Sequence, residues 1–181
     1  MKTELKERLS RIRLLAFDVD GVLTDGSIIL GDDIEVKRFN VKDGAGIALA
    51  QRAGLLVAFV TARESRCVQR RGEELRVADV LQGATDKQGS LDHLARKYQF
   101  GIENVLYMGD DFPDLAALRI AGVSVAPADA VEEIRSLVDI VTVSNGGRGA
   151  VREICEVVLK AQNKWESVVA TFSGRAQELK H

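Results

Sequence analysis

The sequence predicts an α/β fold built around a doubly wound, mostly parallel β-sheet. Short apolar runs alternate along the chain with longer amphipathic segments, as strands and helices do in such folds. The first apolar run ends in acidic residues and a glycine, which is typical of a buried parallel strand that leads into a loop. No internal repeat or proline-rich linker interrupts the 181 residues, so we expect residues 1–181 to form one domain.

The first half of the chain contains a predicted β-hairpin. Ile12–Asp20 is the first strand, and Gly26–Asn40 forms two strand-like pieces around a turn at Gly31–Asp33. A helix follows over Asp43–Ala53, with Asp43 as its N-terminal cap. A buried strand, a helix and a short strand come next, at Leu55–Val60, Glu64–Leu75 and Val77–Leu81.

The second half continues the same alternation. Its predicted helices are Leu91–Tyr98, Leu115–Ala121, Val131–Leu137 and Gly149–Lys164. Its predicted strands are Asn104–Asp111, Val123–Ala126 and Asp139–Val143. Clear periodicity is lost from about Trp165, so residues 165–181 are expected to form a C-terminal tail.

Charge and apolar patterning argue against several classes of protein. The 25 Lys and Arg against 27 Asp and Glu give a formal charge of −2, so no global positive field recruits nucleic acid or an anionic membrane. The longest clean apolar run, Leu55–Val60, is too short to span a bilayer, and the first residues lack the apolar segment of a secretion signal. Cys67 and Cys155 lack metal-ligand spacing, which favours a reduced, cytoplasmic protein.

Polar side chains stand at the ends of three predicted strands. Asp18 and Asp20 end the first, Thr61 ends the second, Asp110 ends a later one, and Lys87 lies in a predicted loop between them. Ligands of parallel sheets bind beyond the carboxyl ends of the strands, so these groups are expected to meet. Clustered carboxylates need a cation or raised pKa values, and an oxygen-only set favours Mg²⁺. A hydroxyl and a lysine are donors that suit a phosphoryl group, so the set predicts phosphoryl transfer.

The motifs resemble those of the haloacid dehalogenase superfamily of phosphatases. The resemblance rests on Asp18–Gly26 (DVDGVLTDG), Thr61, Lys87 and Gly109–Asp114 (GDDFPD). Further segments resemble the 3-deoxy-D-manno-octulosonate 8-phosphate (KDO 8-phosphate) phosphatase family, namely Phe39–Ile47 (FNVKDGAGI), Thr61–Arg63 (TAR) and Gly146–Cys155 (GGRGAVREIC). The match covers a core of about residues 11–162 and implies a haloacid dehalogenase-type fold without a separate cap domain.

The resemblance implies roles for the acidic residues. Asp18 would attack phosphorus, and Asp20 would protonate the leaving sugar oxygen and then deprotonate the attacking water. A free Asp, with a pKa of ~3.9, is almost always ionised at pH 7, so the site is expected to raise the pKa of Asp20 through nearby carboxylates and phosphate. Mg²⁺ would be held by the carboxylate of Asp18, the main-chain carbonyl of Asp20 and Asp110. Asp111 and Asp114 would orient metal-bound water and Lys87.

The implied substrate is KDO 8-phosphate, hydrolysed to KDO and inorganic phosphate in the synthesis of lipopolysaccharide precursors. Thr61 and Lys87 would hold its phosphoryl oxygens, and an arginine could clamp its carboxylate with two hydrogen bonds. The residues that the resemblance assigns to substrate contact are Asp20, Asn40, Val41, Lys42, Asp43, Gly44, Arg63, Arg71 and Lys87.

The sequence departs from the family pattern at two positions. Ala48 stands where the family has a basic residue that contacts substrate, and Ala62 stands where glycine is usual. The change at Ala48 puts the fine substrate preference in question. A sister branch acts on nine-carbon sialic-acid-type phosphates and has an acidic residue where Arg63 stands, so Arg63 favours the octulosonate.

The hairpin is expected to take the place of a cap domain. In the family that the sequence resembles, a neighbouring subunit completes the active site in a tetramer. The alternation of Ile28, Leu30, Ile34 and Val36 gives the hairpin an apolar face, which we expect a homo-oligomer to bury.

Alternatives from other classes fit the motifs less well. A signalling receiver domain also combines an Asp, a Thr and a Lys around Mg²⁺, but its acidic residues come in a different order. A non-catalytic oligomerisation module of the same family can lose catalytic acids, whereas Asp18, Asp20 and Asp110 are all retained here. Arg148 is open to two interpretations, an anion contact or an ordinary surface residue.

Overall fold

The computed structural model describes residues 3–31 and 35–172, and its centre is a six-stranded parallel sheet. The strands lie in the order β5-β4-β1-β6-β7-β8. Their bounds are Leu14–Phe17 for β1, Leu56–Val60 for β4, Asp79–Leu81 for β5, Val105–Met108 for β6, Val123–Ala126 for β7 and Ile140–Val141 for β8. The chain builds one half of the sheet outward from β1 and then returns to build the other half from β6, which confirms the predicted doubly wound α/β fold.

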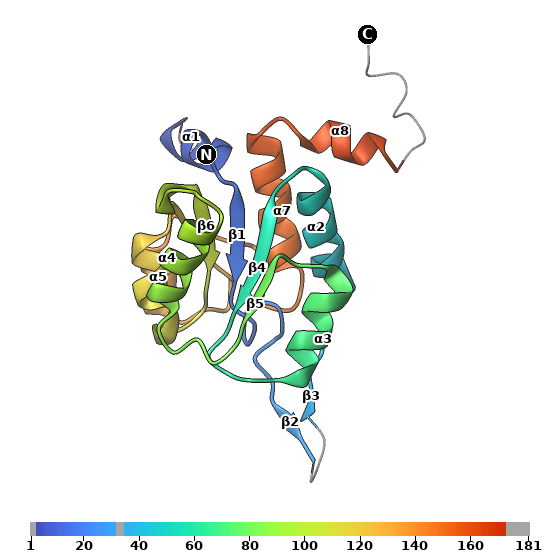
Figure 1. Cartoon of the computed structure of the whole chain (residues 1–181), viewed down its shortest axis with the longest axis vertical. Coiled ribbons are helices and arrows are strands. Elements are labelled where there is room, and N and C mark those ends of the chain that lie inside the picture. The colour runs from blue at the N-terminus through green and yellow to red at the C-terminus, as the bar shows by residue number, and fades with distance from the viewer. Residues whose placement is uncertain (1–2, 32–34, 173–181) are drawn as a thin grey trace.

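Helices cover both faces of the sheet (Figure 1). One layer contains α1 (Thr3–Ser10), α2 (Val41–Arg52), α3 (Arg66–Leu75), α7 (Ala150–Ala161) and α8 (Trp165–Ala170). The opposite layer contains α4 (Lys87–Lys97), α5 (Leu115–Ile120) and α6 (Glu132–Leu137). Strand β1 contributes side chains to both cores, because successive residues of a strand point to opposite faces of the sheet. Leu15 and Phe17 face the first layer, and Leu14 and Ala16 face the second. No helix in the described ranges is long and apolar enough to cross a membrane.

The predicted hairpin is present as a short antiparallel pair, β2 (Ile29–Leu30) and β3 (Glu35–Val36). It projects from the end of the molecule where β1 finishes, beyond the carboxyl edge of the sheet (Figure 1). Ile28, Leu30 and Val36 are between 46% and 70% exposed in the single chain. Ile34 and most of the predicted turn lie outside the described residues.

Two sequence predictions about helix starts were wrong. Lys87 is the first residue of α4 and not part of a loop, because the side chain of Asp86 accepts a hydrogen bond from the Gly89 amide and caps a polar first turn. Helix α2 begins at Val41 with Asn40 as its cap, so Asp43 lies inside the helix. Within the predicted tail, Trp165–Ala170 form α8, whose Val168 packs into the core, and residues 173–181 lie outside the described residues.

Asp43 caps a different helix from the one predicted. The residue is 1% exposed, and its carboxylate accepts hydrogen bonds from the amides of Gly149, at 3.2 Å, and Arg152, at 2.8 Å. Both amides belong to the start of α7, whose first N–H groups have no partners inside their own helix. Asp43 therefore joins α2 to α7, and its oxygens are occupied within the fold.

Replacing Asp43 is expected to affect stability more than catalysis. Asp43→Ala leaves buried amides without acceptors, so we expect the free energy of unfolding to fall by about 2 kcal/mol, and by less in Asp43→Asn, which keeps one acceptor oxygen. Urea denaturation of the two variants measures this. Unchanged stability together with a large rise in KM would instead support the substrate contact that the sequence suggested for this residue.

Candidate active site

A cavity of about 230 Å³ opens at the carboxyl edge of the sheet. Asp18 follows β1, Thr61 follows β4, Asp110 follows β6, and Lys87 enters from the start of α4. The structure therefore brings these four residues together from distant parts of the sequence. The residues that line the cavity are Asp18, Asp20, Thr61, Ala62, Arg63, Lys87, Asp110, Asp111, Pro113 and Asp114.

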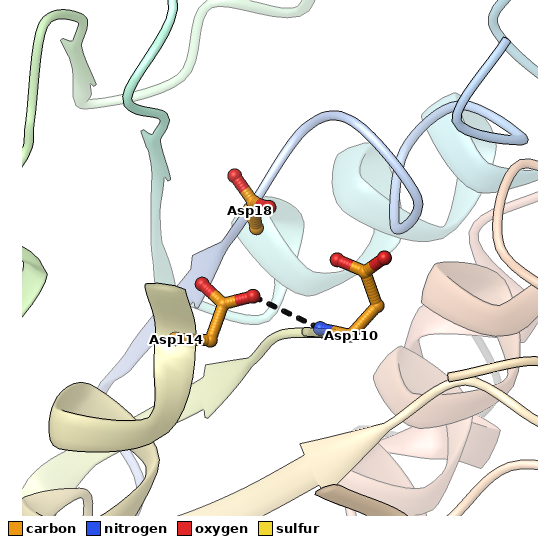
Figure 2. A group of neighbouring side chains, drawn as sticks. All are labelled: Asp18, Asp110 and Asp114. Atoms are coloured by element: carbon orange, nitrogen blue, oxygen red, sulfur yellow. Dashed lines mark hydrogen bonds between the residues drawn. The ribbon is translucent and has the colours of Figure 1, made fainter. Parts of the chain in front are cut away.

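Three carboxylates converge inside this cavity. One oxygen from each of Asp18, Asp110 and Asp114 lies within 4.8 Å of the others (Figure 2). Lys87, whose side chain is 4% exposed, is the nearest cation, with its Nζ 3.0 Å from Asp18 and 2.5 Å from Asp114. One lysine faces three carboxylates, so the cluster is short of positive charge.

Asp114 differs from the other two carboxylates because its oxygens are already in use. Oδ1 accepts hydrogen bonds from Lys87 Nζ and from the hydroxyl of Tyr107, and Oδ2 accepts one from the Asp110 amide at 3.0 Å, the dashed line in Figure 2. No hydrogen bond to the Asp110 carboxylate is found within the described part of the chain. Asp18 and Asp110 thus fit a divalent cation that prefers oxygen ligands, such as Mg²⁺, and Asp114 positions its neighbours.

The pKa values of Asp18, Asp110 and Lys87 are all raised in this cluster, which holds more negative than positive charge. Burial, with the negative charge of Asp114, raises the pKa of Asp18 to about 7, although Lys87 opposes the change. Burial and the charges of Asp18 and Asp114 raise the pKa of Asp110 to about 8. Burial alone would lower the pKa of Lys87, but the two carboxylates outweigh it and raise this pKa above its usual value. A bound cation would remove the repulsion that keeps protons on Asp18 and Asp110.

Gly21 explains why a glycine follows the two aspartates of the first loop. Its φ of +89° lies in the left-handed region, and a Cβ at this position would overlap the carboxylate of Asp110. The loop after β1 can therefore approach the end of β6 closely enough for Asp18 and Asp110 to share one ion.

The side chain of Asp20 lies among cations and not among carboxylates. Its Oδ1 forms an ion pair with Lys37 Nζ, and its Oδ2 is 3.7 Å from Arg63 Nε. The nearby carboxylates that the sequence analysis invoked are therefore not its direct partners. Lys37 was not singled out from the sequence, although Glu35 and Lys37 stand two apart on a strand-like segment and so face the same side.

Tyr107 is a second residue that the sequence analysis missed. It is fully buried in β6 and donates its hydroxyl to Asp114 at 2.6 Å. Burial and the neighbouring carboxylates raise its pKa well above 10, so it remains a donor at neutral pH. A single tyrosine in an otherwise aliphatic buried strand was the available signal, because a buried hydroxyl needs a partner.

The predicted substrate contacts divide into two groups. Asp20, Arg63 and Lys87 line the cavity, whereas the segment 40–44 and Arg71 do not. Asn40 caps α2, and the Arg71 guanidinium pairs with Glu74 and lies directly over Gly44. Within one subunit, the structure does not bring these residues to the phosphoryl site.

Two of the remaining sequence candidates also have structural partners. Asp111 caps the short 3₁₀ helix Phe112–Asp114 and lines the cavity. Arg148 is 57% exposed at its side chain and pairs with Asp25 at 3.3 Å, which agrees with the interpretation as a surface residue.

Comparisons with known proteins agree with this geometry. A model of the haloacid dehalogenase-like hydrolases matches residues 72–154. The 3-deoxy-D-manno-octulosonate 8-phosphate phosphatase KdsC of Salmonella typhi is 41% identical over 165 residues, which cover 91% of this chain and 88% of that protein. KdsC of Escherichia coli strain K12 is 42% identical over 158 residues, 87% of this chain and 84% of that protein. The chain belongs to the KDO 8-phosphate phosphatase family.

Solved structures of this family share the fold closely. The phosphatase of Moraxella catarrhalis, crystallised with magnesium, phosphate and KDO, has a TM-score of 0.92 and 40% identity, and the alignment covers 95% of this chain and 99% of that chain. The cobalt-bound enzyme of Haemophilus influenzae has a TM-score of 0.88 and 36% identity, with 92% and 98% of the two chains covered. The family resemblance inferred from the motifs is thereby confirmed, and the receiver-domain alternative is excluded.

The carboxylate cluster should make the metal-free protein sensitive to pH. A carboxyl whose pKa is higher in the folded protein stabilises the fold fully below its unfolded pKa of about 4 and loses this contribution as the pH rises through its folded value. With folded values of about 7 for Asp18 and about 8 for Asp110, the melting temperature in EDTA should fall between pH 5 and pH 9. Saturating Mg²⁺ should remove most of this fall.

Asp110→Asn tests the cause of that instability. At pH 8 in EDTA the variant should be more stable than the wild type by on the order of 1 kcal/mol, because a repulsive charge is removed. In Mg²⁺ it should lose the stabilisation that the ion gives the wild type. Asp92→Asn, a carboxylate on α4 away from the cluster, is the control; an equal gain there would point to a general charge effect.

Proposed function

We propose that this protein is a Mg²⁺-dependent phosphatase that hydrolyses KDO 8-phosphate to KDO and inorganic phosphate through an aspartyl-phosphate on Asp18. The observation that carries the proposal is the cavity in which Asp18 and Asp110 face one buried lysine and the Thr61 hydroxyl. The Moraxella relative with magnesium, phosphate and KDO, at 40% identity, supports both the cation and the substrate.

The first half of the reaction transfers the phosphoryl group to the protein. Asp18 lies on the cavity wall as the nucleophile, and a new bond forms between its carboxylate oxygen and phosphorus while the bond to the sugar oxygen breaks. Lys87 and Thr61 hold the phosphoryl oxygens, and Asp20 gives a proton to the leaving sugar oxygen. Bound Mg²⁺, held by Asp18, Asp110 and the main-chain carbonyl of Asp20, would supply positive charge that offsets the repulsion between nucleophile and phosphate.

The second half returns the protein to its starting state. Asp20, now ionised, takes a proton from a water molecule, and the resulting hydroxide attacks phosphorus and releases phosphate from Asp18. Asp114 and Asp111 orient the groups around the ion throughout, Asp114 through its hydrogen bonds to Lys87 and the Asp110 amide.

Arg63 is the residue that we assign to the sugar carboxylate. It lines the cavity, and its side chain is 47% exposed at the entrance, where the non-reacting end of a bound sugar would lie. Ala48 lies elsewhere, in a surface hollow between α2 and α3 with Gln51, Arg52 and Leu75. The absence of a basic side chain at position 48 therefore removes nothing from this subunit's own cavity.

The exposed hairpin supports assembly into a homo-oligomer, for which we propose a tetramer. The hairpin projects beyond the sheet (Figure 1), and its apolar residues Ile28, Ile29, Leu30 and Val36 remain between 46% and 70% exposed in the single chain. Segment 40–44 lies at the base of this hairpin, so a neighbouring subunit could give it the substrate contacts that it lacks within one chain. We further propose that one domain performs this reaction in the cytoplasm, in lipopolysaccharide precursor synthesis.

Activity assays test the proposed reaction. Purified protein with Mg²⁺ should release phosphate from KDO 8-phosphate in preference to a nine-carbon sialic-acid-type 9-phosphate and hexose phosphates. Asp18→Asn should reduce kcat at least about 10³-fold because the nucleophile is lost. Asp25→Asn, in the same loop but paired with Arg38 and outside the cavity, should retain near wild-type activity. Preference for the nine-carbon compound would contradict the substrate assignment and leave the chemistry intact.

Sedimentation tests the proposed assembly. Leu30 is 70% exposed, and Leu30→Asp should shift the protein from a tetramer to smaller species because a charge cannot be buried cheaply in an apolar interface. Leu137→Asp, at a partly exposed apolar position on α6, is the matched control. A wild-type monomer at micromolar concentration would contradict the proposal.

A further inference from the structure

Lys37 is buried at the base of the hairpin, and no step of the proposed reaction involves it. Its side chain is 1% exposed, although lysine ammonium groups are almost always kept in water. The Nζ atom forms an ion pair with Asp20 Oδ1 and lies 3.6 Å from Glu35 Oε1. A buried cation is costly unless carboxylates surround it, so these two contacts account for its position.

Glu35 in turn is fixed from the other side. Its Oε2 accepts a hydrogen bond from Ser65 Oγ at 2.6 Å, and its main-chain carbonyl accepts one from Cys67 Sγ at 3.3 Å. Ser65 is the cap of α3, a few residues beyond Thr61. Strand β3 of the hairpin is therefore hydrogen-bonded to the start of α3 in the same subunit. Lys37 lies between Glu35 of this strand and Asp20.

The two carboxylate oxygens of Asp20 differ in their contacts. Lys37 occupies Oδ1, whereas Oδ2 is a buried atom with no hydrogen-bond donor among the residues that the structure describes. Arg63 Nε is 3.7 Å from Oδ2, too far for a hydrogen bond. Asp20 lines the cavity, so one oxygen is held while the other is free to exchange a proton.

We propose that Lys37 is a positioning residue for Asp20: it holds Oδ1 so that Oδ2 meets the leaving oxygen of the substrate, and Glu35 keeps Lys37 in place. This inference rests on the proposed phosphatase function. Asp20 gives its proton to the departing sugar oxygen as the P–O bond breaks, and the carboxylate that forms then takes a proton from the attacking water. Lys37 gains and loses no proton in either step, and it acts only through Asp20.

The choice of leaving group separates this role from a general structural one. A sugar alkoxide leaves only with a proton, whereas p-nitrophenolate leaves without help, so misplacement of the acid should slow phosphoryl transfer from the sugar phosphate alone. Hydrolysis of the aspartyl-phosphate is common to both substrates and affects kcat, but not kcat/KM, which reports only the steps up to release of the leaving group. In Lys37→Met, kcat/KM for KDO 8-phosphate should fall about 10²-fold or more, while kcat/KM for p-nitrophenyl phosphate should change less than about threefold. Glu35→Gln should shift the ratio of the two kcat/KM values in the same direction by a smaller factor.

Three comparisons make the result decisive. Asp20→Asn combined with Lys37→Met should lose no more than Asp20→Asn alone, because Lys37 acts through Asp20. Arg38→Ala, the exposed neighbour that pairs with Asp25, should leave the ratio unchanged. Melting temperatures show whether each variant folds. If Lys37→Met does not fold, the ratio measured for Glu35→Gln is the deciding result.

Two outcomes would overturn the inference in distinguishable ways. Equal losses of kcat/KM on both substrates in a folded Lys37→Met or Glu35→Gln variant, or additive losses in the double variant, would reject the positioning role and leave the phosphatase assignment intact. A wild-type protein that hydrolyses neither phosphate ester would reject the proposed function itself, and the role of Lys37 with it.

Discussion

The buried ion pair between Lys87 and Asp114 is the interaction on which the rest of the site depends. Asp114 also accepts hydrogen bonds from the Tyr107 hydroxyl and the Asp110 amide, so it connects α4, β6 and the loop after β6. With 4% and 1% of their side chains exposed, neither partner could be removed without leaving a buried charge, a loss of about 3–5 kcal/mol. The pair holds Lys87 3.0 Å from Asp18, where a transferred phosphoryl group needs a cation.

The cluster of Asp18, Asp110 and Asp114 carries an excess of negative charge. Asp18 and Asp110 keep raised pKa values because one lysine cannot balance three buried carboxylates. A divalent cation offsets this charge, so the protein is expected to be most stable when the ion is bound. Asp20 lies outside this cluster, between Lys37 and Arg63. The proposed acid and base is therefore in a different electrostatic environment from Asp18, the proposed nucleophile.

The alternation of strand-like and helix-like segments predicted the fold class. The polar residues at the strand ends predicted which side chains meet, because strand ends in a parallel sheet converge at its carboxyl edge. The sequence could not reveal partners set by tertiary packing. Asp43 resembled a cap for its own helix but caps α7, more than 100 positions away in the chain. The polar first turn of α4 hid the helical position of Lys87. Lys37 was missed because its burial depends on how the hairpin folds back onto Asp20.

The most direct test of the account is to trap the phosphorylated protein. Enzyme quenched with acid during turnover of KDO 8-phosphate can be reduced with borohydride, which converts an aspartyl-phosphate to homoserine, and then mapped by peptide mass spectrometry. The account predicts the modification at Asp18, dependent on Mg²⁺. Turnover at full rate with no modification of Asp18, or modification of a different residue, would contradict it.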